Sequence, residues 1–185
     1  MSNLDDALVV LASWLEHHHI PYMVIGGFAV TIWGEPRITR DLDVTISVPA
    51  EEISKTVELV RSEFTVLVTD ALKFVSETRV LPMVAADVPV DLIFAALPYE
   101  DDAIARAKII QLKNGAVRIC SPEDLVLHKI VSPRSRDRED IEGILRYRHS
   151  ELDYHYLDPR VEEVADALAD RTMLEWYRAL RRRWT

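Results

Sequence analysis

The sequence predicts an α/β (α+β) fold, with strands and helices interspersed up to residue 120 and helices from there to the end. Three observations support this prediction. A short apolar strand at 22–25 runs into a glycine pair and an apolar helix, β-branched runs bounded by turn residues occupy much of 65–120, and apolar residues recur at helical spacing from 151 onward. We therefore expect a core domain over residues 1–120 and a helical C-terminal region over residues 121–185, packed on that core.

The elements of the core domain follow from periodicity and turn residues. Leucines repeat at helical spacing from Leu4 to Leu15 and predict an opening helix, which Pro21 prevents from continuing past the histidines at 17–19. The segment 72–94 is rich in β-branched residues, and we interpret it as a hairpin with strands at 79–84 and 90–94. The other elements expected here are strands over 22–25, 41–48 and 65–68, helices over 53–63 and up to 107, and a hairpin over 109–120.

Helix-capping residues divide the C-terminal region. Ser121 is a suitable N-cap, with Pro122 in the first helical position and acidic residues in the first turn, so a helix is predicted over 121–130. Asp158-Pro159 is interpreted as the start of a further helix, and a last helix is expected after residues 170–172.

The composition favours a cytoplasmic protein. No apolar run approaches the roughly 18 residues that a membrane-spanning helix needs, and no basic-plus-apolar leader is present, so no membrane partner is expected. The lone Cys120 cannot form an internal disulfide, which agrees with a reducing compartment. The net charge of −9 argues against broad nucleic-acid binding, while the arginines crowded into residues 134–148 favour a local RNA contact.

The segment 26–43 carries the chemistry of the chain. Gly26 and Gly27 lack Cβ atoms and let the backbone approach a triphosphate, which the N-terminus of the following helix would attract. Asp41 and Asp43 are two residues apart in a predicted strand, so both carboxylates lie on one face. Mg²⁺ is usually held by one or two carboxylates together with substrate phosphates. Taken singly, the glycines are also typical of a tight turn and the aspartates of a solvated strand end.

The spacing of these residues resembles a known motif. Gly26-Gly27 followed by Arg37-x-Thr39-x-Asp41-x-Asp43 is similar to the first motif of the DNA polymerase beta-like nucleotidyltransferase superfamily, in the AbiEii-type branch that includes toxins of bacterial toxin–antitoxin pairs. That family often has Gly-Ser where this chain has Gly-Gly. A second block, residues 121–130 and 136–141, is similar to a later motif of the same family. The resemblance implies a mixed β-sheet flanked by helices, with a helical C-terminal part.

A third carboxylate interrupts an apolar strand further along the chain. Asp91 lies in such a strand, where a carboxylate is costly unless it is paired, hydrogen-bonded or bound to a cation. If this strand lies beside that of Asp41 and Asp43, the three carboxylates form a cluster, and the resemblance also implies the third acidic residue at this place. The alternative is a capped aspartate on an edge strand.

The second block adds a lysine and an aspartate. The resemblance implies that Lys129 contacts the nucleotide phosphates, together with Gly26, Gly27, Arg37 and Thr39, and that Asp140 supports the catalytic site. From the residues alone, Lys129 would equally extend its ammonium to solvent. Asp140 would equally pair with Arg136, four residues earlier, or with Lys129.

The implied reaction transfers a nucleoside monophosphate from a nucleoside triphosphate such as ATP to an acceptor, and releases pyrophosphate. By resemblance, Asp41, Asp43 and Asp91 are the catalytic carboxylates and bind two Mg²⁺ ions, for which Mn²⁺ is an alternative. The acceptor stays open between RNA such as tRNA, a protein hydroxyl and a small molecule such as an aminoglycoside, and a cognate antitoxin is a further expected partner. Two alternatives are a non-catalytic, antitoxin-like binding protein of the same fold and a metal-dependent nuclease.

Overall fold

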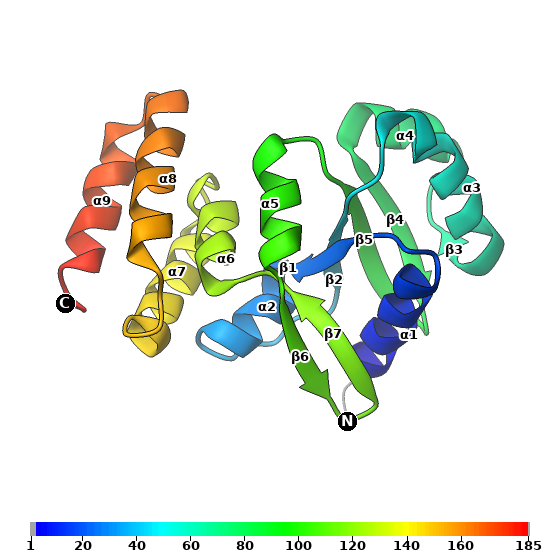
Figure 1. The fold of residues 1–185 in the computed structure, drawn as a ribbon, viewed down its shortest axis with the longest axis horizontal. Helices are drawn as coiled ribbons and strands as arrows, with labels where there is room; N and C mark the ends of the chain where they lie inside the picture. Colours follow the sequence, from blue (N-terminus) through cyan, green and yellow to red (C-terminus); the bar gives the residue numbers. More distant parts are fainter. Residues whose placement is uncertain (1–2, 185) are drawn as a thin grey trace. The chain divides into compact units, whose positions relative to one another are not determined.

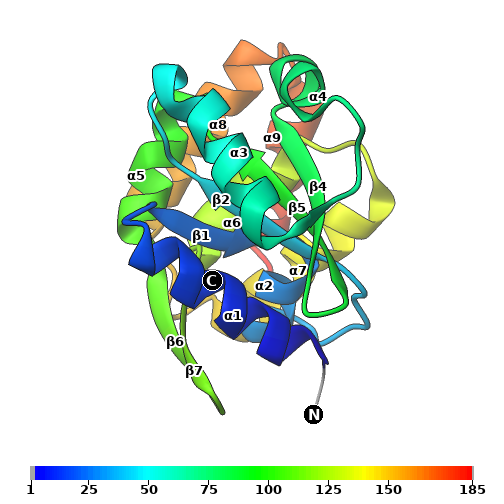
Figure 2. The ribbon, with the colours of Figure 1, turned by 90° about the vertical axis from the view of Figure 1, so that its right-hand side faces the viewer.

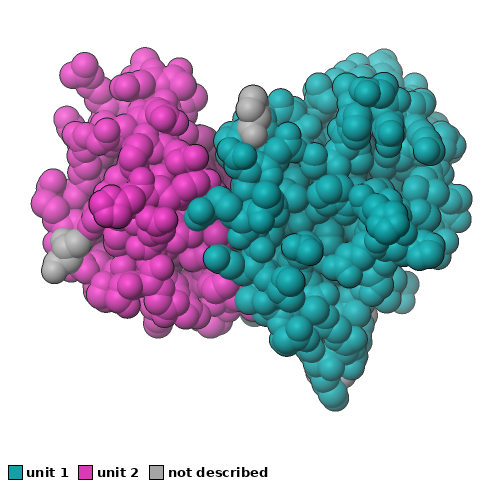
Figure 3. Space-filling model, viewed as in Figure 1, with its two compact units in different colours: residues 1–28, 38–120 teal, residues 29–37, 121–185 magenta. Residues whose placement is uncertain are grey.

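The structure is a computed structural model that describes residues 3–184 (Figure 1). The chain forms two compact units (Figure 3). Unit 1 comprises Met1–Phe28 and Ile38–Cys120, and unit 2 comprises Ala29–Arg37 and Ser121–Thr185. This division has a boundary after residue 120, and it also assigns residues 29–37 to unit 2, which the sequence did not suggest. Packing of the C-terminal region on the core stays a prediction.

Unit 1 is built on a mixed sheet of seven strands in the order β3-β4-β5-β2-β1-β7-β6. Strand β2 pairs in parallel with β5, and β1 pairs in parallel with β7, whereas the remaining neighbours are antiparallel. The strands are β1 (Tyr22–Ile25), β2 (Leu42–Ile46), β3 (Thr65–Val66), β4 (Val80–Ala85), β5 (Val88–Phe94), β6 (Lys108–Leu112) and β7 (Gly115–Ile119).

The two faces of this sheet differ in burial. Strand β5 alternates between buried residues such as Leu92 and Phe94 and accessible residues such as Asp91, as expected for a sheet with one face in the core. Helix α1 (Asn3–His17) packs on the buried face, because a Cβ on Gly115, which shares that face, would meet Val9 of α1. Figure 2 shows α1 and α3 (Ile53–Glu63) on the same side of the sheet. Asp91 therefore lies on the face away from α1.

One helix of unit 1 was not expected. Residues Ala71–Thr78 form α4, where the sequence predicted the beginning of a β-rich segment. Asp70 caps this helix by accepting a hydrogen bond from the N–H of Lys73, and a cap of this kind overrides the weak strand tendency of the residues that follow. The predicted hairpin is confirmed, and its turn is Ala86-Asp87, where both residues have positive φ, as a two-residue hairpin loop requires.

Helices complete both units. In unit 1, α5 (Pro98–Arg106) follows β5, and a short 3₁₀ helix (Ala50–Glu52) precedes α3. Helix α2 (Gly26–Trp33) begins in unit 1 and continues into unit 2. Unit 2 also contains α6 (Pro122–Ile130), α7 (Ser135–Arg148), α8 (Tyr154–Ala167) and α9 (Arg171–Arg181). Within this unit α6 packs against α7 and α8, and α8 packs against α9.

The predicted helix start at Asp158-Pro159 is wrong. Helix α8 begins at Tyr154, capped by Asp153, whose carboxylate accepts from the N–H of Tyr156, and Pro159 lies inside the helix. The tyrosine-rich segment before Pro159 is thus the first turn of the helix. The Ser121 cap and the final helix after Asp170 agree with expectation. Within residues 3–184 no helix combines the length and apolar character that crossing a bilayer would require.

Candidate active site

Two carboxylates from distant parts of the sequence meet on neighbouring strands of unit 1. Asp43 of β2 and Asp91 of β5 are register partners in a parallel pair, so both side chains leave the sheet on the same face. The sequence predicted that Asp91 would join the other carboxylates if its strand lay beside that of Asp43. The two strands are indeed neighbours. Asp91 is exposed and Asp43 is half-buried. Two like charges at adjacent positions repel each other, which makes this pair unusual as a purely structural feature.

Gly26 brings the start of α2 against one of these carboxylates. Its φ is +62°, and a Cβ at this position would lie 1.8 Å from Oδ2 of Asp43. Only glycine accommodates both the left-handed backbone and this close approach. The first N–H groups of a helix have no acceptor within the helix and carry a partial positive charge. The Asp43 carboxylate thus lies where a helix N-terminus favours negative charge.

Asp41 lies in the exposed loop before β2, because the strand begins at Leu42 and not at residue 41 as predicted, so strand alternation does not place Asp41 on the face of Asp43. The hydroxyl of Thr39 donates a hydrogen bond of 3.0 Å to Oδ1 of Asp41. Partial loss of hydration raises the pKa of the Asp91 carboxyl, and the negative charge of Asp41 raises it further. The charge of Asp41 therefore reaches Asp91. A cation bound between Asp41 and Asp91 would lower the pKa of Asp91 again.

The described residues do not form a ready-made metal cage. In residues 3–184, with the side chains of Asn3 and Pro98 outside the description, no three histidine, cysteine, aspartate or glutamate side chains are grouped closely enough to hold a metal ion. Asp43 and Asp91 nevertheless fit Mg²⁺, which is commonly held by one or two carboxylates while phosphate oxygens and water complete its shell. The histidines at 17–19 likewise form no metal site in this part of the chain.

Lys129 lies in unit 2 and is paired with carboxylates there. Its side chain is 7% exposed, and its ammonium lies 2.8 Å from Oδ1 of Asp137 and 2.7 Å from Oδ2 of Asp140. Lys129 therefore does not extend to solvent, and the pairing of Asp140 with Lys129, rather than with Arg136, is the alternative that the structure adopts. The site residues predicted from the sequence did not include Asp137. Its position three residues before Asp140 on one helix was the available signal.

Arg37 joins this network in the same unit. Its Nε and Nη2 donate to the two carboxylate oxygens of Asp140 at 2.9 and 3.1 Å. Asp137 is in turn bound by Arg134, at 2.6 Å. Although burial raises the pKa of Asp137, hydrogen bonds from Lys129, Ser132 and Arg134 outweigh it and lower the pKa to about 2. We define these five charged residues, Arg37, Lys129, Arg134, Asp137 and Asp140, as the α6–α7 ion network.

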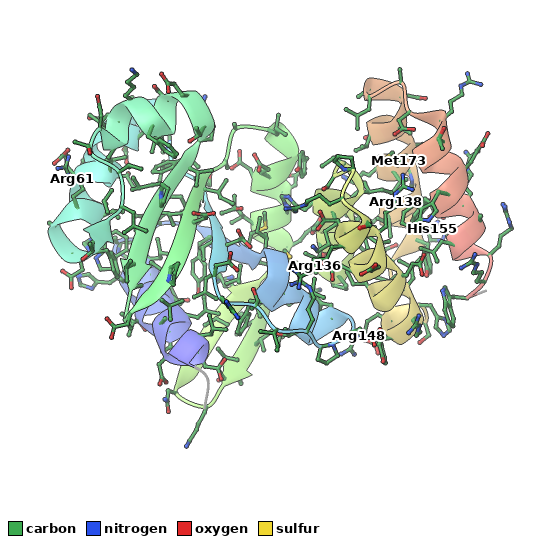
Figure 4. The ribbon with its side chains drawn as sticks, turned by 180° about the vertical axis from the view of Figure 1, so that it is seen from behind. Arg61, Arg136, Arg138, Arg148, His155 and Met173 are labelled. Atoms are coloured by element: carbon green, nitrogen blue, oxygen red, sulfur yellow. The ribbon has the colours of Figure 1, made fainter. Side chains whose placement is uncertain are left out.

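The arginines of α7 are mostly engaged by neighbours within unit 2. Arg146 lies 3.3 Å from Glu35, and Arg148 pairs with Glu151 and lies over the ring of Trp33. Arg138 lies over the ring of Trp176, and Figure 4 shows Arg136, Arg138 and Arg148 at separate places. Arg146 and Arg148 are therefore paired with carboxylates, and the RNA contact stays a prediction.

Comparison with protein families matches residues 2–185 to the family described as "Nucleotidyltransferase of unknown function (DUF6036)". The chain belongs to this family. Two solved structures share the fold. An antigenic nucleotidyltransferase-like protein from Paracoccidioides brasiliensis has a TM-score of 0.56 at 18% identity, over 94% of this chain and 92% of that chain. The lincosamide antibiotic adenylyltransferase LnuA, solved with lincomycin bound, has a TM-score of 0.51 at 14% identity, over 75% of this chain and 94% of that chain.

No curated protein matches the chain. At the identities of the two solved structures the likeness concerns the fold, and it confirms the nucleotidyltransferase-like α/β architecture predicted from the sequence. The carboxylates of unit 1 therefore lie in a chain whose family is one of nucleotidyltransferases.

Proposed function

We propose that the chain is a magnesium-dependent nucleotidyltransferase, which transfers a nucleoside monophosphate from a nucleoside triphosphate to the hydroxyl of an acceptor. The observation that carries this proposal is the register pairing of Asp43 with Asp91, with Asp43 against Gly26 at the start of α2. A carboxylate pair beside a helix N-terminus offers one place for cations and one for phosphates. The family assignment supports the same reaction class.

The proposed roles follow from position. Asp41, Asp43 and Asp91 would hold Mg²⁺, which when bound would neutralise charge on the triphosphate and on the carboxylates. The backbone of Gly26 and Gly27 would bind phosphate oxygens. The acceptor oxygen attacks the α-phosphorus, the bond from that phosphorus to the β-bridging oxygen breaks, and pyrophosphate leaves with the electron pair. Asp91 would take the proton that the acceptor hydroxyl loses.

The residues of unit 2 are assigned more limited roles. Lys129 and Arg37 were predicted to contact phosphates, and both now have carboxylate partners. An ammonium has three donors, and Lys129 uses two of them on Asp137 and Asp140. We propose that Arg37 and Asp140 stabilise unit 2 through their own ion pair, and that direct contact with a nucleotide belongs to unit 1.

A toxin of the AbiEii type, acting with a cognate antitoxin in the cytoplasm, is the biological setting that we propose from the motif spacing. The transfer reaction does not depend on this toxin role. A small adjacent or overlapping reading frame whose product neutralises this chain in co-expression would support it, and full tolerance of the chain expressed alone would contradict it.

The reaction is tested by incubating the protein with each α-labelled nucleoside triphosphate, Mg²⁺ and a mixture of acceptors. We expect label transfer and pyrophosphate release, and both should be lost in Asp43→Asn. Removing Mg²⁺ from the unmodified protein with a chelator should also abolish transfer, and adding Mn²⁺ should restore it. The matched control is Asp101→Asn, an aspartate on α5 that binds Ser47. Nucleotide binding without any transfer would favour the non-catalytic alternative, and RNA shortening without a triphosphate would favour a nuclease.

A further inference from the structure

On the side of Asp91 away from Asp43, the strands of the sheet carry no charged residue. Asp91 is the only ionisable residue in the described strands β3, β4 and β5. Its register partner on β4 is Pro82, and the flanking pairs are Val80 with Ile93 and Val84 with Pro89. We call these five residues, Val80, Pro82, Val84, Pro89 and Ile93, the apolar platform.

The apolar platform lies on the accessible face of the sheet. Residues of the opposite face, such as Leu81, Met83 and Leu92, are fully buried under the helices. By contrast, Pro89 is exposed and the other four platform residues are half-buried. Figure 4 shows β4 and β5 from this side with no helix of unit 1 in front of them. Apolar side chains left accessible beside a reactive carboxylate are typical of a binding surface.

We infer that the acceptor is a small, uncharged, largely apolar molecule with a hydroxyl group, which lies on the apolar platform and presents that hydroxyl to Asp91. This inference rests on the proposed function. The platform is continuous with the proposed site, because Asp91 lies in its middle row, between Pro82 on β4 and Asp43 on β2.

The charges of this surface argue against RNA and against a polycationic small molecule as the acceptor. RNA binding requires lysine and arginine against phosphates, and the strands β3, β4 and β5 contain neither. Two exposed charged residues lie next to these strands. Arg79 precedes β4, and Asp87 lies in the turn between β4 and β5. A polycationic acceptor requires carboxylates beyond those that hold metal, and Asp91 is the single carboxylate that the platform offers. An apolar body without charge is the remaining match.

The size of the surface limits the size of the acceptor. Strands β2, β5 and β4 are neighbours, which gives a width of about 10 Å at the usual strand spacing. Three rows of side chains along the strands give a length of about 14 Å. A molecule of two to four rings, or an equivalent aliphatic body, covers such an area.

The test compares three acceptor classes in one label-transfer assay. The protein is given its preferred labelled triphosphate and Mg²⁺ with a panel of uncharged phenols and long-chain alcohols, with a polycationic aminoglycoside, or with purified tRNA. We expect transfer to members of the uncharged panel alone. Transfer to tRNA or to the aminoglycoside alone would overturn the inference and leave the proposed function intact.

Two platform variants extend the test. Ile93→Lys places a charge on the platform, and we expect the KM for the acceptor to rise about tenfold or more with kcat and nucleotide affinity little changed. The matched control is Ile109→Lys on β6, where the isoleucine is 60% exposed and distant in the strand order. If Ile93→Lys does not fold, Val84→Thr keeps the shape and adds one hydroxyl, with a smaller rise in the same KM.

Failure of the inference and failure of the proposed function give different results. Equal KM values in Ile93→Lys, Ile109→Lys and the unmodified protein would overturn the inference while transfer continues. Nucleotide binding with no transfer to any of the three classes would also overturn it. Absence of both nucleotide binding and transfer would overturn the proposed function as well.

Discussion

Both units of this chain bring aspartates together, but the surroundings of the two sets differ. In unit 2, Asp137 and Asp140 lie around the buried ammonium of Lys129, and arginines bind their remaining oxygens. In unit 1, Asp43 and Asp91 are register partners in strands that contain no lysine or arginine. In the first arrangement cations of the same unit bind the carboxylates, whereas the second brings two carboxylates to adjacent positions, an arrangement that suits Mg²⁺.

This difference separates a structural cluster from a functional one. A compensated cluster stabilises the fold, and breaking it is expected to lower the free energy of unfolding. Two like charges at adjacent strand positions repel each other until a cation binds, so neutralising one of them is expected to remove activity and slightly increase stability.

Removing the central cation of the α6–α7 ion network is expected to have the largest effect. Lys129→Met leaves two buried carboxylates with less compensation, and we expect the free energy of unfolding to fall by about 3–5 kcal/mol. Denaturant unfolding measures this change, with Lys55→Met, at an exposed lysine of α3, as the control. A loss no larger than that of the control would mean that the network does not stabilise unit 2.

Gly26 provides the matching test in unit 1. Gly26→Ala introduces a Cβ at φ +62° that would lie 1.8 Å from the Asp43 carboxylate. We expect a loss of at least about 2 kcal/mol in the free energy of unfolding, together with loss of nucleotide binding, because the start of α2 must move. Gly34→Ala is the control, since its nearest contact, to Ile144, would be 3.2 Å. Unchanged nucleotide affinity in Gly26→Ala would contradict the proposed phosphate site.

The low pKa of Asp137 predicts a pH dependence of stability. Its pKa is about 2 in the folded protein and about 3.9 in an unfolded chain. The unfolded state therefore binds more protons between these values, and stability is fully present above about pH 4 and falls by about 2 kcal/mol as the pH approaches 2. Asp137→Asn should flatten this part of the stability curve. An identical acid limb in the variant would assign the effect to other carboxylates.

Asp91 is expected to show the opposite sign. Loss of hydration and the charge of Asp41 raise its pKa, so its ionisation opposes folding when no cation is bound. Asp91→Asn should increase the free energy of unfolding of the metal-free protein at pH 7 by less than about 1 kcal/mol, since the group is exposed and screened. The same variant should transfer no label. A less stable variant would show that Asp91 already has a compensating partner.

The comparison also shows which features the sequence discloses. The glycine pair and the Ser121 cap are local, because they depend on residues a few positions apart, and the helices that they predict formed. The predicted strand over 41–48 formed only over Leu42–Ile46, so Asp41 lies outside it and the alternation does not extend to Asp41. Helix α4 was missed because its single strong signal, the Asp70 cap, was outweighed by β-branched residues further along. The helix start predicted at Pro159 is wrong for a related reason. Proline is typical of the first turn of a helix, but the cap of this helix is Asp153.

Partners across the chain were less accessible to sequence reasoning. The pairing of Asp43 with Asp91 depends on the order of strands in the sheet, and it could be stated only as a condition. The pairing of Lys129 with Asp140 was one of two alternatives, and Asp137 was overlooked. A lone lysine and a lone aspartate carry the same sequence signal whether they bind a ligand or each other, and only their distances distinguish the two cases.

The proposed function requires the carboxylates of unit 1 to bind a divalent cation together with a nucleotide. The most direct measurement is isothermal titration calorimetry of a nonhydrolysable nucleoside triphosphate into the protein, with and without Mg²⁺, for the unmodified chain and for Asp43→Asn. We predict binding that requires Mg²⁺ and that is lost in the variant, while Asp101→Asn binds normally. Binding that is unaffected by Mg²⁺ or by Asp43→Asn would contradict the account.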